Sequence, residues 1–274
     1  MILQVLMENT AVSDAFVCEH GLSLYVEAGG TRILFDTGRS DAFVQNAAAC
    51  GVELSQVDLA VLSHGHYDHG GGLTAFLAAN DHAPVYRHTL ADEPHFVQRP
   101  DGEIAFIGLP PELLNTPRFR ALDDDAEIAP GLTVFSSVTG RELLSGANRT
   151  LLIRQGAGYA PDPFAHEQSL LIEREGKAVL LAGCAHRGIV NILTRAMALH
   201  GGPLDAVVGG FHLSNPRTGV CEPDETIRGV AARLSRYPTR YYTGHCTGRA
   251  AFDKLAPLMG EQLTYLPAGS RIEL

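Results

Sequence analysis

A chain of 274 residues, of which 45% are hydrophobic and 19% charged, is long enough to bury the core of one large α/β domain or of two small ones. The formal net charge of −10, with no run rich in lysine or arginine, disfavours a nucleic-acid partner. The N-terminus lacks the basic region and apolar core of a signal peptide, and no stretch approaches the roughly 18 apolar residues that a membrane span needs. Five widely spaced cysteines do not make a secreted disulfide framework, so we expect a cytoplasmic protein with no membrane partner.

The first 90 residues predict short strands interrupted by two helices. Apolar and β-branched runs indicate strands over residues 2–6, 21–27, 31–35, 58–62 and 84–88. Gly29-Gly30 supplies a hairpin turn between the second and third of these strands. Helices are predicted over residues 41–50, with Ser40 as the N-cap and Gly51 as the stop, and over residues 73–79.

The loop between the predicted strand 58–62 and the helix 73–79 concentrates side chains that bind metals. It reads Ser-His-Gly-His-Tyr-Asp-His-Gly-Gly-Gly over residues 63–72. Imidazole nitrogen and carboxylate oxygen are ligands of zinc and similar metals. His64 and His66 are two residues apart and can face one ion, while Asp68 and His69 can reach a second ion beside it. Two ions about 3.5–4 Å apart can hold a hydroxide and polarise a substrate oxygen, and strand-to-helix loops are where α/β folds place their chemistry.

The stretch 89–146 has the weakest pattern, because six prolines interrupt it. We interpret it as an insertion that lies over the mouth of the site, with one strand near residues 132–136. This stretch and its flank carry aromatic and basic side chains that could line a substrate pocket: His88, His95, Phe96, Phe106, Arg118 and Phe119. For each of them singly, an ordinary loop or packing role is the simpler interpretation.

In the second half of the chain, apolar strands again end in glycine-flanked histidines. Strands are predicted over 169–173, 178–182, 204–208 and 239–243, the first two as a hairpin, with closing strands over 263–266 and 271–274. Helices are predicted over 189–199, 222–237 and 249–259. His186, His212 and His245 follow three of the strands, which with the loop at 63–72 makes four such strand ends. A parallel-rich sheet would bring all four ends to one edge.

Sequence position leaves the role of several histidines open. His212 follows Gly209-Gly210-Phe211 and could be a metal ligand, although a general acid or a substrate-orienting group beside the metals is the favoured interpretation. His20, His82 and His200 have no such context, and we predict that they are surface or core residues.

The stretch His64-Gly65-His66-Tyr67-Asp68-His69 resembles the HxHxDH signature of the metallo-β-lactamase superfamily. The resemblance implies one domain over residues 1–274 with a four-layer αββα sandwich. It also implies site roles for residues elsewhere in the chain: Asp36 as a support of the metal loop, Cys184 as a group that touches or bridges the metals, and His245 as the final metal histidine. His186 could point the same way as Cys184. His166-Glu167 stands where many relatives have another metal histidine, but its local pattern departs from theirs, so either residue or neither could bind metal.

The motifs Gly-Cys-Ala-His-Arg-Gly-Ile-Val-Asn, Gly-Gly-Phe-His-Leu and Gly-His-Cys-Thr-Gly resemble one subgroup more narrowly, the dihydropteroate-synthase-like proteins of this superfamily. This resemblance implies a pterin-diphosphate-dependent transferase as an alternative function. A phosphate-bearing substrate would need basic residues, and the insertion and its flank offer few: Arg87, Arg99, Arg118 and Arg120.

The favoured function is a dinuclear-metal-dependent hydrolase of a small molecule. Two Zn²⁺ ions, or Fe or Mn in their place, would be held by His64, His66, Asp68, His69, His245 and one or both of Cys184 and His186. A metal-bound hydroxide would attack an ester, lactone or phosphoryl centre, with Asp68 orienting it and His212 stabilising or protonating the leaving oxygen. Besides the transferase, the alternatives are a non-catalytic metal- or ligand-binding protein, which the intact ligand set disfavours, and a nuclease, which the acidic charge balance disfavours.

Overall fold

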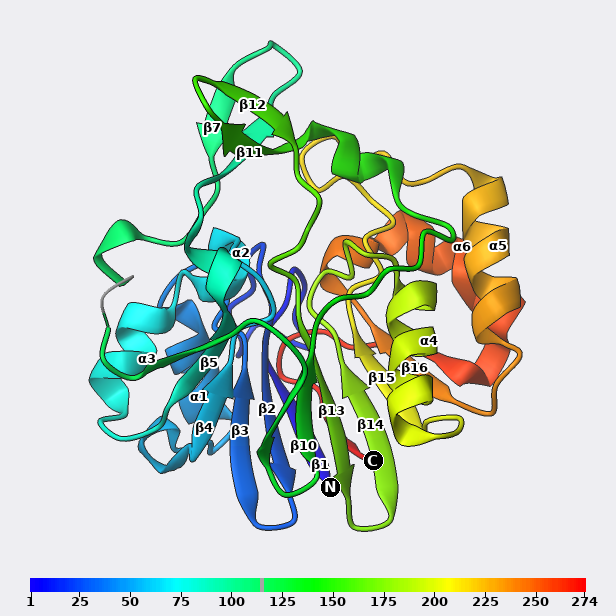
Figure 1. Ribbon diagram of the computed structural model, residues 1–274. Coiled ribbons are helices and arrows are strands. Elements are labelled where there is room, and N and C mark those ends of the chain that lie inside the picture. Colours follow the sequence, from blue (N-terminus) through cyan, green and yellow to red (C-terminus); the bar gives the residue numbers. More distant parts are fainter. Residues whose placement is uncertain (114–115) are drawn as a thin grey trace.

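Two large sheets packed face to face form the centre of the molecule in the computed structural model, which describes residues 1–113 and 116–274 (Figure 1). The first sheet has the strand order β18-β1-β2-β3-β4-β5-β8. Its strands are β1 (Ile2–Met7), β2 (Ser23–Ala28), β3 (Thr31–Phe35), β4 (Leu59–Val61), β5 (Val85–His88), β8 (Phe119–Leu122) and β18 (Arg271–Glu273).

The second sheet has the strand order β17-β16-β15-β14-β13-β10-β9. Its strands are β9 (Ala126–Ala129), β10 (Leu132–Phe135), β13 (Ser169–Arg174), β14 (Lys177–Leu181), β15 (Ala206–Gly209), β16 (Arg240–Thr243) and β17 (Leu263–Tyr265). Strands β3, β4 and β5 of the first sheet run parallel to one another, and so do β14 to β17 of the second. The histidine loops follow four of these strands, β4, β14, β15 and β16.

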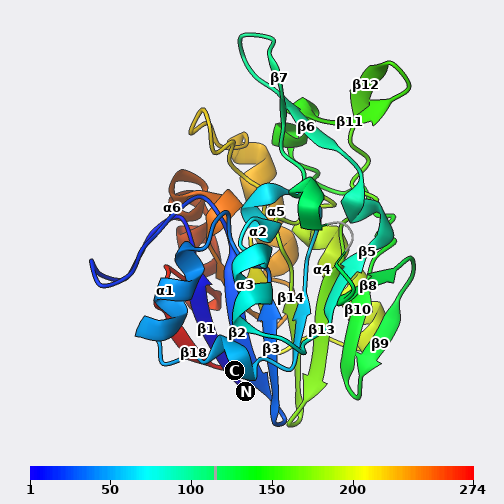
Figure 2. The ribbon, with the colours of Figure 1, turned by 90° about the vertical axis from the view of Figure 1, so that its left-hand side faces the viewer.

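Helices cover the outer face of both sheets, which confirms the predicted four-layer αββα sandwich (Figures 1 and 2). The first sheet is covered by α1 (Ala42–Ala49) and α3 (Leu73–Ala79), and the second by α4 (Ile189–His200), α5 (Asp224–Leu234) and α6 (Arg249–Met259). The N-cap of α1 is Asp41 and not the predicted Ser40, whose hydroxyl nevertheless accepts the N–H of Ala42 at 3.2 Å. Helix α5 begins later than the predicted 222–237, because Pro223 takes the N-cap position and cannot continue the helix backwards, and it ends at Leu234 instead of residue 237.

The side chains of the central strands alternate between the two faces of each sheet, and this gives three hydrophobic layers: one between the two sheets and one between each sheet and its helices. In β3, the side chains of Ile33 and Phe35 lie between the two sheets, whereas Leu34 packs with Phe43 on the α1 side. Strand β14 alternates in the same way between the inter-sheet layer and the helices of the second sheet. Because successive side chains of a strand point to opposite faces, each central strand is buried on both sides. This explains why these segments are continuous apolar runs in the sequence.

The four histidine-bearing strand ends do not share one sheet, so the expectation of a single sheet edge is wrong. Strand β4, which precedes His64, belongs to the first sheet, whereas β14, β15 and β16 belong to the second. The loops still converge, because the carboxyl ends of these strands point to the same end of the sandwich (Figure 1). The site therefore lies across the mouth between the two sheets.

A small third sheet projects beyond this end of the sandwich (Figures 1 and 2). Its order is β12-β11-β6-β7, with β6 (His95–Gln98), β7 (Ile104–Phe106), β11 (Leu151–Gln155) and β12 (Gly158–Pro161). Of the stretch 89–146, only β6 and β7 belong to this sheet, while β8, β9 and the predicted strand β10 are part of the two large sheets, and residues 114–115 lie outside the described residues. The projecting part therefore has different boundaries from the expected insertion, because β6 pairs with β11 more than 50 positions later, from Leu151↔Val97 to Ile153↔His95.

Among residues 1–113 and 116–274, no helix combines the length and the apolar character that crossing a bilayer requires.

Candidate metal centre

The metal loop is built on the end of β4 and enters the one-turn helix α2 (Tyr67–Gly70). Ser63, at its start, donates its N–H and its hydroxyl to the Asp36 carboxylate, each at 2.7 Å. Asp36 lies at the end of β3 with φ of 60°, a left-handed conformation that directs its buried carboxylate under the loop. Asp36 thus supports the loop from the neighbouring strand, as predicted for it, and it contacts a ligand histidine as described below.

Three imidazole nitrogens converge in a first group. His64 Nε2 lies 3.1 Å from His66 Nδ1 and 3.3 Å from His186 Nε2. Two nitrogens bound at about 2.0–2.1 Å to one tetrahedral ion lie roughly 3.3 Å apart, so each of these two pairs, both made with His64, has a separation that fits a shared metal. Burial, reinforced by the other histidines, lowers the pKa of all three rings well below its usual value, which favours the neutral form that binds metal.

A second group lies beside the first. His69 Nε2 is 3.2 Å from His245 Nε2, and Asp68 Oδ2 is 3.4 Å from His245 Nε2 and 3.8 Å from His69 Nε2. Cys184 Sγ is 3.1 Å from His69 Nε2 and also falls within 4.8 Å of ligand atoms of His64 and His186. The structure therefore brings together all seven side chains predicted as metal ligands, with the Cys184 thiol in reach of both groups.

Most of these histidines are oriented by a hydrogen bond on the ring nitrogen that faces away from the group. The pairs are His64 Nδ1 with Ser63 Oγ at 2.9 Å, His69 Nδ1 with Asp36 Oδ2 at 2.6 Å, His186 Nδ1 with Asn148 Oδ1 at 3.0 Å and His245 Nδ1 with Asn9 Oδ1 at 2.9 Å. An oxygen acceptor on Nδ1 keeps the ring proton there and leaves Nε2 with its lone pair. The chain thus fixes the tautomer that a metal ligand needs.

His166 and Glu167, left open by the sequence, belong to neither group. His166 Nδ1 accepts the N–H of Gly65 at 2.9 Å, and its Nε2 faces Asp162 at 3.2 Å, so both ring nitrogens are used. Glu167 accepts the backbone N–H of His186 at 2.7 Å and of Arg187 at 2.8 Å. Burial raises the pKa of Glu167 to about 7, although these two N–H groups oppose the shift. Glu167 therefore holds the loop that carries Cys184 and His186, and His186 supplies the third nitrogen of the first group.

Backbone strain gathers at this site. Besides Asp36, the non-glycine residues Ala185, His212 and His245 adopt positive φ values of 59°, 48° and 50°. Each such residue costs on the order of 1–3 kcal/mol and persists only where the surroundings impose it, which is common at functional sites. The strained positions are the turns that aim the three strand-end loops of the second sheet into the centre.

Two further histidines lie at the site. The ring of His212, predicted as a catalytic group, is buried 4.2 Å from that of His186 between centroids, and neither of its nitrogens has a hydrogen-bond partner in the described part of the chain. His20 was predicted to be a surface or core residue, which is wrong: its Nε2 lies 3.2 Å from Asp68 Oδ2, and its ring stacks on His245. In the sequence, the only hint that this region belongs to the site was the polar pair Glu8-Asn9 directly after β1. Asn9 contacts both His20 and His245.

A cavity of about 630 Å³ opens above the two groups. His66, Asp68, Cys184, His186 and His212 line its floor, and its walls come from residues 97–100, 102 and 107 of the projecting part, residues 147, 150 and 151, and residues 215–218. The side chains that sequence reasoning offered as pocket residues, namely His88, His95, Phe96, Phe106, Arg118 and Phe119, are not among those that line it. The basic residues of the cavity are instead Arg39, Arg99 and Arg217.

Comparison with known proteins gives consistent matches. Residues 17–201 match the family described as the metallo-beta-lactamase superfamily. A curated relative from Methanocaldococcus jannaschii, named 7,8-dihydropterin-6-methyl-4-(beta-D-ribofuranosyl)-aminobenzene-5'-phosphate synthase, is 25% identical over 95% of this chain and 92% of its own length. An uncharacterized protein of the same organism is 28% identical over 94% of each chain.

Solved structures show the same architecture. One described as a metal-dependent hydrolase of the beta-lactamase superfamily matches 100% of this chain and 99% of its own, with a TM-score of 0.83 and 25% identity. The Zn²⁺-bound PqqB from Methylobacterium extorquens matches 100% of both chains with a TM-score of 0.62 and 16% identity, a likeness of fold alone.

Proposed function

Because the chain belongs to the metallo-beta-lactamase superfamily, a superfamily of metal-dependent hydrolases, we propose that it is a dinuclear-metal-dependent hydrolase of an anionic small molecule. The observation that carries this proposal is the convergence of buried ligand atoms from His64, His66 and His186 and from Asp68, His69 and His245 beneath one cavity, whose lining includes His66, Asp68, Cys184 and His186. Side chains from four strand ends, those of β4, β14, β15 and β16, meet there.

The residues present fit a pair of divalent ions. The first ion would be held by His64, His66 and His186, and the second by Asp68, His69 and His245, with Cys184 available to either. Imidazole, carboxylate and thiolate together suit zinc, and iron or manganese are the alternatives. When bound, such ions supply Lewis-acid activation of a water molecule and of a substrate oxygen.

The protein's own groups account for orientation and proton transfer. Asp68 lines the cavity, and its Oδ2 lies 3.2 Å from His20 Nε2. Its carboxylate can accept a hydrogen bond from a water molecule and orient that water towards the substrate. His212 lines the floor with both ring nitrogens unpartnered among the described residues, which leaves it free to donate a proton to the leaving oxygen. A non-catalytic binding protein would have no use for such a histidine.

The charge around the cavity favours an anionic substrate. The chain carries a net charge of −10, yet Arg39, Arg99 and Arg217 line the cavity and Asp68 is its only lining carboxylate among the described residues. Arg99 pairs with Glu103, whereas the side chains of Arg39 and Arg217 have no ion-pair partner in the part of the chain that the structure describes. Free guanidinium groups beside the metals suit a phosphate or carboxylate on the substrate. The size of the cavity suits a small molecule rather than a nucleic acid.

A second candidate function is a transferase that uses a pterin diphosphate. The name of the relative from Methanocaldococcus jannaschii favours it, together with the subgroup motifs in the sequence. The same arginines would then receive the diphosphate, and the proton from His212 would go to the departing group. The two candidates differ in the acceptor, which is water for the hydrolase and an aromatic amine or ring carbon for the transferase.

The first experiment is elemental analysis of the purified, metal-replete protein and of the His64→Ala/Asp68→Ala variant, with the exposed His82→Ala as the matched control. We expect about two equivalents of zinc, iron or manganese per chain in the wild type and in the control, and a loss in the double variant. A screen of esters, lactones, phosphodiesters and pterin diphosphates, with and without an arylamine acceptor, then separates hydrolase from transferase. A metal-replete wild type that binds no metal would refute both candidates and favour the binding protein.

The anionic-substrate part has its own test on the substrate that the screen identifies. Arg217→Ala should raise KM with little change in kcat, because the guanidinium binds the ground state and the transition state equally. An unchanged KM, with Arg39→Ala also silent, would refute the assignment of the arginines to substrate binding.

A further inference from the structure

The end of strand β1 reaches the metal centre from the sheet opposite to the one that carries His245. Strand β1 runs antiparallel to β2, and β2 runs antiparallel to β3, so β1 shares the direction of β3 and β4. Its carboxyl end therefore lies at the end of the sandwich where the histidine loops converge (Figure 1). The two residues that follow it, Glu8 and Asn9, belong to the first-sheet side, whereas His245 follows β16 of the second sheet.

Glu8 and Asn9 contact three separate groups of His245. The His245 backbone N–H donates to Glu8 Oε1, and the His245 carbonyl accepts from Asn9 Nδ2 at 3.3 Å. The ring is held as well, because His245 Nδ1 lies 2.9 Å from Asn9 Oδ1. Both polar groups of the backbone and the outer ring nitrogen of this histidine are thus bonded to two adjacent residues that come from the other sheet.

The Asn9 amide is oriented by backbone groups, and its orientation sets the tautomer of His245. The Gly21 N–H can only donate, so the atom of Asn9 that faces it at 3.3 Å is the oxygen. The His245 carbonyl can only accept, so the atom of Asn9 that faces it is the NH₂ nitrogen. Because the Asn9 oxygen also faces His245 Nδ1, the ring proton lies on Nδ1, and Nε2 keeps its lone pair for the second group.

Glu8 is a buried carboxylate that uses both of its oxygens. Oε1 accepts the His245 N–H and the Tyr265 hydroxyl, and Oε2 accepts the N–H and the hydroxyl of Thr10, each at 2.6 Å. A Cβ atom built on Gly244 would stand 3.0 Å from Glu8 Oε1, so the glycine lets the carboxylate approach the His245 backbone. An ionised carboxylate accepts and does not donate, which suits it to this set of four donors.

His245 requires such support because its backbone is strained. It adopts φ of 50°, which a non-glycine residue keeps only where its surroundings impose it, at a cost on the order of 1–3 kcal/mol. We propose that Glu8 and Asn9 form a clamp that imposes this conformation and directs His245 Nε2 at the second metal group. Both are positioning residues, since they act through His245, and the inference rests on the proposed metal pair.

The first group has a counterpart of Glu8 in Glu167. The Glu167 carboxylate accepts the backbone N–H groups of His186 and Arg187, and His186 is the histidine that the second sheet supplies to the first group. In each group, therefore, one buried glutamate holds the backbone N–H of one second-sheet histidine. Removing the two glutamates one at a time should then affect different ions.

The test is chelator competition on Co²⁺-loaded protein, which gives the affinity and the visible spectrum of each ion, with His64→Ala and His245→Ala to identify which ion belongs to which group. Each oxygen of Glu8 accepts a backbone N–H, from His245 or from Thr10, so either orientation of the amide in Glu8→Gln sets an NH₂ group against a backbone donor. We expect affinity at the second group to fall 10- to 100-fold and its spectrum to change, with the first group unaffected. Glu167→Gln meets the same conflict at its own two backbone donors and should give the opposite result, a loss at the first group.

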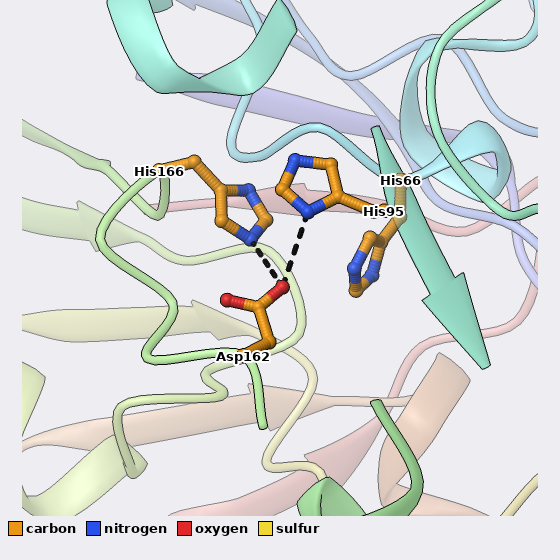
Figure 3. A group of neighbouring side chains, drawn as sticks. All are labelled: His66, His95, Asp162 and His166. Carbon is orange, nitrogen blue, oxygen red and sulfur yellow. Dashed lines mark hydrogen bonds and ion pairs between the residues drawn. The ribbon is translucent and has the colours of Figure 1, made fainter. Parts of the chain in front are cut away.

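Two further variants separate positioning from a loss of fold. Asn9→Ala changes a half-buried residue and leaves Glu8 in place, and it should also weaken the second ion selectively. The matched control is Asp162→Asn, the same change from carboxylate to amide at a buried residue that is hydrogen-bonded to His95 and His166 beside the metal loop (Figure 3). Its affinity for the second ion should equal that of the wild type.

A folded Glu8→Gln or Asn9→Ala protein that binds the second ion with wild-type affinity and spectrum would overturn the clamp and leave the proposed metal pair intact. Equal losses at both groups in Glu8→Gln would overturn it as well, because they would show a general loss of stability. If Glu8→Gln does not fold, the result for Asn9→Ala decides. Absence of metal from the metal-replete wild type would overturn this inference and the proposed function together.

Discussion

Replacing Asp36 by Asn tests how the second metal group is oriented. The Asp36 carboxylate accepts three hydrogen bonds, from the Ser63 N–H, the Ser63 hydroxyl and His69 Nδ1. Burial by itself would lower the pKa of His69, but the charges of Asp36 and Asp68 raise it, so the imidazole is strongly polarised towards Asp36. In the Asn variant, an NH₂ group takes the place of one oxygen. If the amide oxygen stays with the Ser63 N–H, the amide N–H faces the proton on His69 Nδ1.

His69 can avoid this clash of two donors only by moving its proton to Nε2, which removes the lone pair that faces the second group. The loss of such a support costs about 10- to 100-fold in metal affinity, or about 1.4–2.8 kcal/mol. We expect chelator competition to show this loss at the second ion, with a smaller effect at the first. Hydrogen bonds to a charged group contribute about 1.5–3 kcal/mol each, so the metal-free variant should also unfold at lower urea concentration.

The matched control is Asp58→Asn, because Asp58 is also a well-bonded carboxylate, accepting from the backbone and guanidinium of Arg32. Asp58 precedes β4, at the end of the strand opposite the metal loop, so its variant should keep both metal affinities. An Asp36→Asn protein that folds and binds the second ion with wild-type affinity would refute the tautomer argument.

Three further outcomes follow from packing and linkage. Phe35→Ala, in the inter-sheet core, should reduce the free energy of unfolding by about 3–5 kcal/mol in urea titration, whereas Leu258→Ala at an exposed position should stay within about 0.5 kcal/mol; equal effects would contradict the assigned core. Gly65→Ala should cost about 1–3 kcal/mol in thermal unfolding, because its Cβ would lie 2.5 Å from the Ala91 carbonyl oxygen, and an unchanged midpoint would show that the loop can yield. Removing metal with a chelator should lower the unfolding midpoint, and excess Zn²⁺ should restore it in a concentration-dependent way, since an ion that binds only the folded chain stabilises it by mass action; identical midpoints would count against a bound metal.

Local pattern was sufficient for the main helices and for the strands outside residues 89–161, whereas the layer architecture was implied by the family resemblance, and β6, β7, β8, β9, β11 and β12 were not predicted. Strands such as β3 and β14 are short apolar runs because they are buried on both faces, and that composition is visible without any partner. The metal loop could also be predicted from the sequence, because four side chains of metal-binding types lie within six positions on a strand-to-helix turn.

The arrangement of the histidine loops and the roles of single histidines were decided only by the tertiary structure, because they depend on contacts between distant segments. The sequence placed the histidine loops on one sheet edge, whereas they come from two sheets that share an open end. The sequence also left the role of His166 open, because that role depends on a backbone donor at Gly65, about 100 positions away. The position of His20 was missed for the same reason, since its contact with Asp68 of the metal loop forms only in the folded chain. Ligand identity is a property of side-chain type and spacing and can be read along the chain; the direction in which a ring nitrogen points is set by its hydrogen-bond partner, and that partner is found only after the chain has folded.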